Sequence, residues 1–297
     1  MTEWTKLLDP ARRLFDTRSD ELESRTNGEP IPLIASYGGG LNSTAGLVLF
    51  SKIGVRPDAI LFADTAAEKP DTYAHVAFMS EWCASVGFPS ITVVKRDCDH
   101  ERQKSVQKYD TLEEECIAKK QLPSIAYFGR SCSHKWKHDP QNKWANHWPP
   151  AVERWKTGNV LKAIFFDADE PDRASVQSSK GYQNWYPLLD YDWGREECRQ
   201  AIKLAGIPLP PKSCFFCSEM GIDEILELKE KHPELMARAL AMEANARLTS
   251  IKGLGKHDYA WKDVDEGRVS LTMLPKRERE RKCGCFDGDG PTLFDEE

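Results

Sequence analysis

The sequence lacks any apolar run long enough to cross a membrane. A membrane-spanning helix needs about 20 mostly apolar residues, and no segment of this 297-residue chain approaches that length. The first twenty residues are charged and contain no apolar stretch of the kind a secretory signal needs. These absences predict a cytoplasmic protein with no membrane-bound segment.

The chain also lacks a strong excess of either charge outside its last residues. The formal net charge is −6, and five acids between Asp287 and Glu297, with no base among them, account for most of it. The rest of the chain is therefore almost neutral. Bulk charge neither indicates nor excludes a nucleic-acid partner.

Cysteine, by contrast, is plentiful, with nine residues. A reducing cytoplasm argues against a disulfide framework. Two close pairs, Cys214-x-x-Cys217 and Cys283-x-Cys285, favour metal or cluster binding, and free thiols are the alternative. None of the seven histidines is assigned to a metal.

Apolar segments alternate with helical patterns in the first two thirds of the chain. Strands are expected at 31–36, 58–63, 91–94 and 162–166, with helices after the first strand and over 69–86. Strands that alternate with helices predict an α/β fold, a Rossmann-like parallel sheet flanked by helices.

The same pattern divides the chain into three parts. Residues 1–30 form an N-terminal extension. Residues 31–210 form the α/β core, with a Trp-rich insertion at about 98–160 that shows no clear periodicity. Residues 211–297 form a helical C-terminal region that holds the cysteine pairs and the acidic tail.

Three consecutive glycines follow the first expected strand. Gly38, Gly39 and Gly40 allow positive φ and a close approach of phosphate oxygens, and the helix that follows directs its free N–H groups at an anion. An ordinary strand-to-helix turn is the alternative reading. No Gly-Lys-Ser/Thr follows, which excludes a Walker A motif, and the spacing does not fit a dinucleotide fingerprint.

The loop resembles the PP-loop Ser-Gly-Gly-x-Asp-Ser of the adenine nucleotide alpha hydrolase superfamily, and specifically the phosphoadenosine-phosphosulfate (PAPS) reductase-like family. Gly38 replaces the first Ser of that pattern and Asn42 replaces its Asp. Further similar segments run in order along the chain: Asp64-Thr65 with Pro70 to Tyr73, Arg130 to Lys137, Asp167 to Arg173, and Tyr186 to Trp193. Asp167 stands where the family often has Arg.

The resemblance implies that an adenine nucleotide, ATP or a PAPS-like compound, lies across the strand tips with Mg²⁺ near Asp64. It implies these nucleotide-binding residues: Ser36, Tyr37, Gly38, Gly39, Gly40, Leu41, Asn42, Ser43, Thr44, Asp64, Thr65 and Arg173. Arg173 is also the candidate catalytic cation, since a guanidinium holds two phosphate oxygens at once. A surface ion pair with Asp169 or Asp172 is its alternative role.

Cluster-bearing adenylyl-sulfate reductases imply a further site. Cys132, Cys214 and Cys217 match part of their cluster ligands, and Cys283 or Cys285 is a candidate fourth ligand of a [4Fe–4S] cluster, with Zn²⁺ as the alternative. Cys283 is also the candidate nucleophile of a sulfonucleotide reductase, near Arg279, Arg281 and Lys282.

Three functions therefore stay open. The first is cleavage of the nucleotide at the α-phosphate to activate an acceptor, with cluster-assisted sulfur transfer as one form of it. The second is PAPS or adenylyl-sulfate reduction through Cys283. The third is a nucleotide-binding accessory subunit without catalysis, for example in a phage or defence system. The acceptor is a nucleic acid or a protein, and a homo-oligomer or an accessory complex is compatible with each.

The insertion interleaves tryptophans with basic residues. Trp136, Trp144, Trp148 and Trp155 lie among Arg130, Lys135, Lys137 and Lys143. Such a surface can stack nucleobases, and packing of the tryptophans against the core is the alternative.

Overall fold

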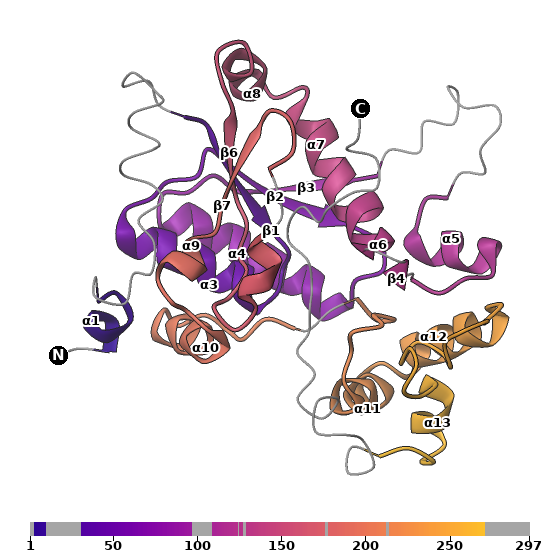
Figure 1. Ribbon diagram of the computed structural model, residues 1–297. Helices are drawn as coiled ribbons and strands as arrows, with labels where there is room; N and C mark the ends of the chain where they lie inside the picture. The colour runs from indigo at the N-terminus through magenta and orange to yellow at the C-terminus, as the bar shows by residue number, and fades with distance from the viewer. Residues whose placement is uncertain are drawn as a thin grey trace.

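The central element of the structure is a five-stranded parallel sheet (Figure 1). The computed structural model describes residues 3–9, 31–96, 109–123, 125–126, 129–175, 178–211 and 214–270. Across the sheet the strands are β3 (Ile91–Lys95), β2 (Ala59–Asp64), β1 (Leu33–Tyr37), β6 (Val160–Ala163) and β7 (Tyr182–Trp185). The expected α/β class, with helices flanking a parallel sheet, is confirmed.

Strand β1 lies in the middle and pairs with β2 on one side and β6 on the other. Ala35 is the register partner of Ile60 in β2 and of Ala163 in β6. The chain builds the β2–β3 side first and then returns to add β6 and β7. The strand order therefore reverses between β1 and β6, and in open α/β sheets ligands bind beyond the carboxyl ends of the strands at such a point.

Helices cover both faces of the sheet because side chains alternate along each strand. In β1, Leu33, Ala35 and Tyr37 join one core and Ile34 joins the other. The first face is covered by α1 (Glu3–Leu7), α3 (Leu41–Ile53), α4 (Pro70–Ser85), α9 (Pro187–Asp190) and α10 (Arg195–Leu204). The second is covered by α7 (Asp139–Ala145) and α8 (Pro149–Arg154).

The insertion contains short helices that its sequence pattern did not indicate. They are α5 (Leu112–Lys119), α6 (Ser131–Ser133), the π-helix η2 (His134–His138), α7 and α8, with the small hairpin β4 (Ile125–Ala126) and β5 (Gly129–Arg130). Helices α5 and α8 have eight residues or fewer, too short for an amphipathic repeat to stand out. α6, η2 and α7 run on without a break over residues 131–145, but the π turn in the middle interrupts the regular helical spacing.

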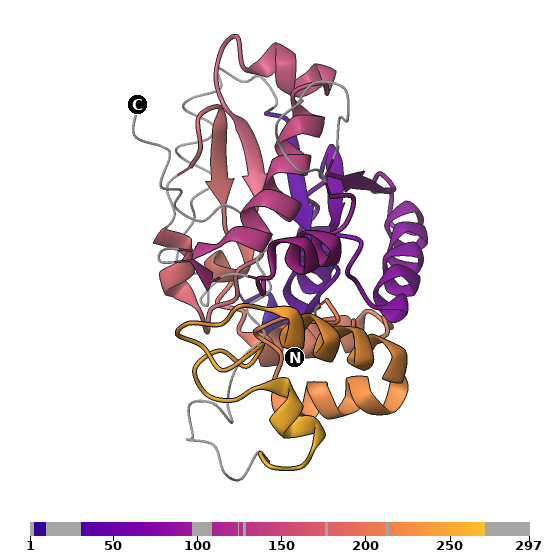
Figure 2. The ribbon, with the colours of Figure 1, turned by 90° about the vertical axis from the view of Figure 1, so that its right-hand side faces the viewer.

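A second core joins the insertion to the C-terminal region. Helices α11 (Ile222–Lys231), α12 (Pro233–Asn245) and α13 (Trp261–Asp265) lie below the sheet in both views (Figures 1 and 2). Their buried side chains share one apolar cluster with Leu112 and Cys116 of α5 and with Trp136 of η2. Within the described residues, no helix combines the length and the apolar character that crossing a membrane requires.

Helix α3 approaches the sheet closely at one glycine. A Cβ atom on Gly46 would lie 1.9 Å from the Phe165 ring, which follows β6. Phe165 packs in turn on Phe50, with ring centroids 5.5 Å apart. Gly46 therefore sets how near α3 comes to β6, and so where the loop before α3 lies.

We expect Gly46→Ala to destabilise the protein by about 1–3 kcal/mol, because the added methyl forces Phe165 out of its place. Replacing glycine by alanine in a helix interior normally raises the free energy of unfolding by about 0.5–1 kcal/mol. A lower free energy of unfolding in this variant is therefore due to the clash with Phe165. Urea unfolding measures it. Gly221→Ser is the control, since no described atom lies within 4 Å of a Cβ there and Ser caps a helix well. Equal stability of Gly46→Ala and wild type would contradict this packing.

Candidate functional site

The loop between β1 and α3 lies at the carboxyl end of the sheet, beside the point where the strand order reverses. Gly40 is the N-cap of α3, and the amide of Thr44 donates to the Gly40 carbonyl at 3.0 Å. The amides of the first helical turn lack intrahelical acceptors. They carry the positive end of the helix dipole, which favours an anion.

The glycines of this loop have separate roles. Gly39 has φ of +72°, a conformation that side chains rarely adopt, and a Cβ there would lie 3.2 Å from Phe62. Gly40 has ordinary φ, and no described atom lies within 4 Å of a Cβ built on it. Gly39 shapes the turn, whereas Gly40 leaves space on the side where a ligand would approach.

A chain of buried polar groups fixes the loop from beneath. The Tyr37 hydroxyl lies 3.2 Å from Thr44 Oγ1, which lies 3.2 Å from Nε2 of His75. Burial lowers the pKa of His75 to about 4, so this imidazole is neutral at pH 7. Ser43 Oγ accepts from the Gly38 amide at 3.1 Å. The side chains of Tyr37, Ser43 and Thr44 thus stabilise the turn. Because their oxygens already have partners, backbone amides are the groups left to contact a ligand.

Asn42 and Asp167 meet across the reversal point. Nδ2 of Asn42 donates to Oδ2 of Asp167 at 3.0 Å, and Oδ1 of Asp167 accepts from the Asp169 amide at 3.1 Å. Asp167 is fully buried, and burial raises the pKa of its carboxyl. Among the described residues, Oδ1 of Asn42 is buried without a hydrogen-bond partner. This carbonyl oxygen at the loop can therefore accept a hydrogen bond from a ligand.

The Asp64-Thr65 pair lies at the end of β2, next to the loop. Oδ1 of Asp64 accepts from the Ala66 amide at 2.8 Å and from the Tyr73 hydroxyl at 2.7 Å, while Oδ2 pairs with Lys95 at 3.2 Å. Thr65 Oγ1 donates to Glu68 at 3.1 Å. Both carboxylate oxygens of Asp64 thus have partners, and a Mg²⁺ ion near it would compete with Lys95.

Arg173 lies on the short 3-10 helix η3 (Pro171–Ser175), after β6. Its guanidinium donates to Glu170 at 2.6 Å and lies over the Phe166 ring, 4.4 Å from the centroid. The ion pair weighed from the sequence therefore exists, although with Glu170 as its partner. A phosphate would have to displace that carboxylate.

The thiols of three segments gather in the second core. Cys116 of α5 is buried, and Cys132 and Cys214 pack against the same cluster. Burial raises the pKa of Cys116 to about 12, with contributions from Glu115 and from the nearby Cys132 and Cys214. The amide of Cys217 donates to the Cys214 carbonyl at 3.1 Å, so these two cysteines belong to the same backbone turn.

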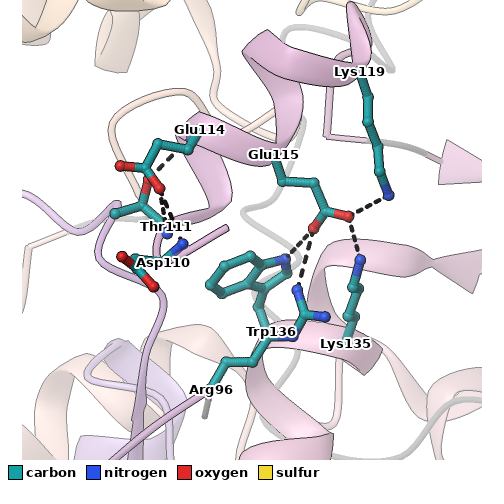
Figure 3. A network of polar contacts seen from close by, with 8 residues as sticks. All are labelled: Arg96, Asp110, Thr111, Glu114, Glu115, Lys119, Lys135 and Trp136. Carbon is teal, nitrogen blue, oxygen red and sulfur yellow. Dashed lines mark hydrogen bonds and ion pairs between the residues drawn. The ribbon is translucent and has the colours of Figure 1, made fainter. Parts of the chain in front are cut away.

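Beside the thiols, Glu115 collects four donors (Figure 3). Its carboxylate accepts from Lys119 at 2.5 Å, from Lys135, and from the Trp136 indole at 2.7 Å, and it pairs with Arg96 at 3.6 Å. Trp136 is buried here, so it belongs to the core and not to a base-stacking surface.

The last two candidate cysteines and several ligand-type side chains that the sequence did not indicate remain to be placed. Cys283 and Cys285 lie outside the described residues. Sequence reasoning did not single out Cys116, which is 16 residues from Cys132 and outside any close pair. It also assigned no histidine to a metal, although His134 and His138 have a spacing of four and lie with Asp139 in a group of ligand-type side chains.

A comparison of the chain with protein-family models finds no match, and a comparison with curated proteins finds no significantly similar sequence.

Glu115 makes the stability of the fold depend on pH. Burial alone would raise the pKa of this carboxyl, but hydrogen bonds from Lys119, Lys135 and Trp136 lower it from 4.5 to about 2. The stabilisation is therefore complete above the unfolded-state pKa of 4.5 and is lost as the pH falls towards 2. We expect a loss of roughly 2–3 kcal/mol across that range, measured by urea unfolding.

The Glu115→Gln variant should be less stable at pH 7 and show a smaller fall with acid. Glu114→Gln is the matched control, since Glu114 is exposed and a Gln preserves its capping box with Thr111 (Figure 3). The idea fails if Glu115→Gln and wild type lose stability in parallel below pH 5.

Proposed function

We propose that this protein is a PAPS-reductase-like PP-loop protein that binds an adenine nucleotide, ATP or a PAPS-like compound, on the loop at residues 38–44. The observation that carries the proposal is the loop itself: a glycine turn that ends β1, opens α3 and lies where the strand order reverses. Amides there have no intrahelical acceptor, and the side chain that would fill the space is absent at Gly40.

One further observation supports an anionic ligand at this loop. The hydroxyls of Tyr37 and Thr44 are occupied with each other, which keeps the turn rigid without covering its amides. A preformed set of donors avoids the ordering cost of binding.

The proposed chemistry is cleavage at the α-phosphate. With ATP as the nucleotide, an acceptor oxygen forms a bond to the α-phosphorus, the bond from that phosphorus to the α,β-bridging oxygen breaks, and pyrophosphate leaves with the electron pair; a hydroxyl acceptor gives up its proton to solvent. Acceptor and AMP become joined. The protein contributes position and charge: loop amides hold phosphate oxygens, and Arg173, once released from Glu170, is the cation for the leaving group.

A cluster of cysteine side chains, called the thiol group below, is proposed as a second part of the site. Cys116, Cys132 and Cys214 lie at one apolar cluster and Cys217 shares the turn of Cys214, so the four residues are proposed as thiolate ligands, a donor type that suits a [4Fe–4S] cluster, with Zn²⁺ as the alternative. When bound, an iron–sulfur cluster supplies electron transfer or an iron that holds sulfur. The Phe215 amide donates to the Ala67 carbonyl at 3.0 Å, so the turn of Cys214 and Cys217 is tied to the segment after Thr65.

One observation favours a second candidate, nucleotide binding without turnover. Asn42 and Asp167 both depart from the PP-loop family pattern, and they are bonded to each other. Asn42 places a neutral amide where the pattern has an aspartate. Asp167 places a buried carboxyl where the family often has an arginine. A nucleotide-binding accessory subunit would tolerate that change, and the products of ATP incubation distinguish the two functions.

Gly40→Asp tests the nucleotide site without harming the fold. A side chain there meets no described atom, and Asp is a good N-cap, so stability should be retained or raised. The carboxylate would occupy the phosphate space, and we expect ATP binding to weaken by more than tenfold, about 1.4 kcal/mol or more. Isothermal calorimetry measures the affinity.

Gly40→Asn is the matched control, with the same size and no charge, and its affinity should lie between the other two. Unchanged ATP binding by Gly40→Asp, or no heat with any adenylate in wild type, would contradict the site. With an acceptor present, AMP and pyrophosphate indicate catalysis, ADP and phosphate contradict α-phosphate cleavage, and binding without products identifies the accessory function.

The thiol site is tested by the metal content of protein purified without oxygen. We expect iron and sulfide, with loss of both in Cys116→Ser and in Cys132→Ser, because three thiolates hold a cluster less tightly. Cys83→Ala is the control, since Cys83 is buried in the core between α4 and the sheet. Zinc in place of iron would identify the alternative metal, whereas wild-type protein free of both would refute the site.

A further inference from the structure

Three metal-ligand side chains lie together on the insertion, outside the nucleotide loop and the thiol group. One ligand atom from each of His134, His138 and Asp139 lies within 4.8 Å of the other two. Oδ1 of Asp139 is 3.6 Å from Nδ1 of His134 and 3.7 Å from Nδ1 of His138. The two imidazole rings have centroids 5.1 Å apart.

The backbone explains why these three residues meet. Residues 134–138 form a π-helix, and the Asp139 amide donates to the His134 carbonyl five residues before it. In a helix with this wider turn, positions four and five residues on both lie above the first residue. Such π turns are rare and are frequently found at functional sites.

We propose that His134, His138 and Asp139 bind one divalent first-row transition-metal ion, with Zn²⁺ as the representative, and leave a coordination position open to solvent. Two imidazoles and one carboxylate suit zinc or iron better than magnesium or calcium. Catalytic zinc sites have three protein ligands and a water. The exposed side-chain fractions of His134 and Asp139, 42% and 45%, leave that fourth position accessible.

Two of the three distances between ligand atoms are close to those around a bound ion, and the third, between the two imidazole nitrogens, is within 4.8 Å. Zinc lies about 2.0–2.1 Å from nitrogen and oxygen ligands, which puts tetrahedral ligand atoms about 3.3 Å apart. The two nitrogen-to-carboxylate distances of 3.6 and 3.7 Å need to shorten by only a few tenths of an ångström. Side-chain rotation of the half-exposed His134 and Asp139 supplies that change.

Surrounding contacts hold the site in place next to the sheet. Nδ2 of Asn142 lies 3.0 Å from Nε2 of His138 and limits rotation of the ring. With a metal on Nδ1, the Nε2–H of His138 would need an acceptor, so the Asn142 amide would have to turn its oxygen towards the ring. Gln141 accepts from Ser36 of β1 at 2.9 Å, and Lys137 pairs with Glu68 at 3.9 Å. The segment is therefore anchored to the ends of β1 and β2, beside the nucleotide loop.

Zinc counting tests the proposal. Tag-free protein is stripped of metal with a chelator, equilibrated with Zn²⁺ under reducing conditions without nucleotide, and analysed for zinc per chain. Zinc bound by the thiol group is the same in every variant. The proposal is therefore tested by the difference in zinc per chain between the variants. Wild type and the control His147→Ala, whose exposed histidine lies in the turn just after α7, should each hold one zinc more than His134→Ala and His138→Ala.

Absorption of the Co²⁺ form gives the second readout. Nitrogen and oxygen ligands give weak visible bands without the strong near-ultraviolet band of thiolate ligation, and His134→Ala should remove those weak bands alone. His134 is half-exposed, so its variant should unfold at the metal-free wild-type temperature. Equal zinc counts in all four proteins, or a cobalt spectrum unchanged in His134→Ala, would overturn the proposal. Nucleotide plays no part in either measurement.

Discussion

The parallel pairing of β1 with both β2 and β6 is the constraint on which the rest of the structure depends. It places the chain reversal beside the end of β1, so the loop at residues 38–44 emerges where neighbouring loops diverge to opposite sides. The contact of Gly46 with Phe165 then fixes the depth of α3. Strand order and helix packing together position a set of amides that local sequence alone would leave as an ordinary turn.

A chain of contacts connects this loop to the insertion and to the second core. Ser36 reaches Gln141, Glu68 pairs with Lys137, and Ala67 bonds to Phe215 in the cysteine turn. Each contact involves a residue at or just after the end of β1 or β2. The loop at residues 38–44, the thiol group and the group of His134, His138 and Asp139 are therefore carried by elements attached near the carboxyl ends of β1 and β2.

The sequence predicted the parts of the fold in which apolar residues are continuous or regularly spaced. Strands β1, β2 and β6 are buried throughout, whereas β3 is buried only at Ile91 and Val94. The ends of β1, β2 and β3 were expected within two residues, and those of β6 within three. Strand β7 was missed because Gln183 and Asn184 interrupt its apolar pattern. In the insertion, α5 and α8 were missed because each is too short for a repeat, and the continuous helical segment 131–145 was missed because its π turn breaks the regular spacing.

The candidate site was predictable only where its residues adjoin in sequence. The glycine loop and the Asp64-Thr65 pair stand out as motifs. Contacts between distant residues leave no local signal: Asn42 is 125 residues from Asp167, and Cys116 belongs to no motif. The histidine group differs, since the spacing of His134 and His138 is visible in the sequence, but only the π turn adds Asp139 to the same side.

The central claim is that main-chain amides after β1 hold the phosphates of an adenine nucleotide. Hydrogen–deuterium exchange of peptides covering residues 36–46, with and without saturating ATP, tests it most directly. The account predicts slower exchange at residues 39–43 when ATP is present, and no change in peptides from α12. Exchange in the loop that is identical with and without ATP, under conditions where ATP is bound, would contradict it.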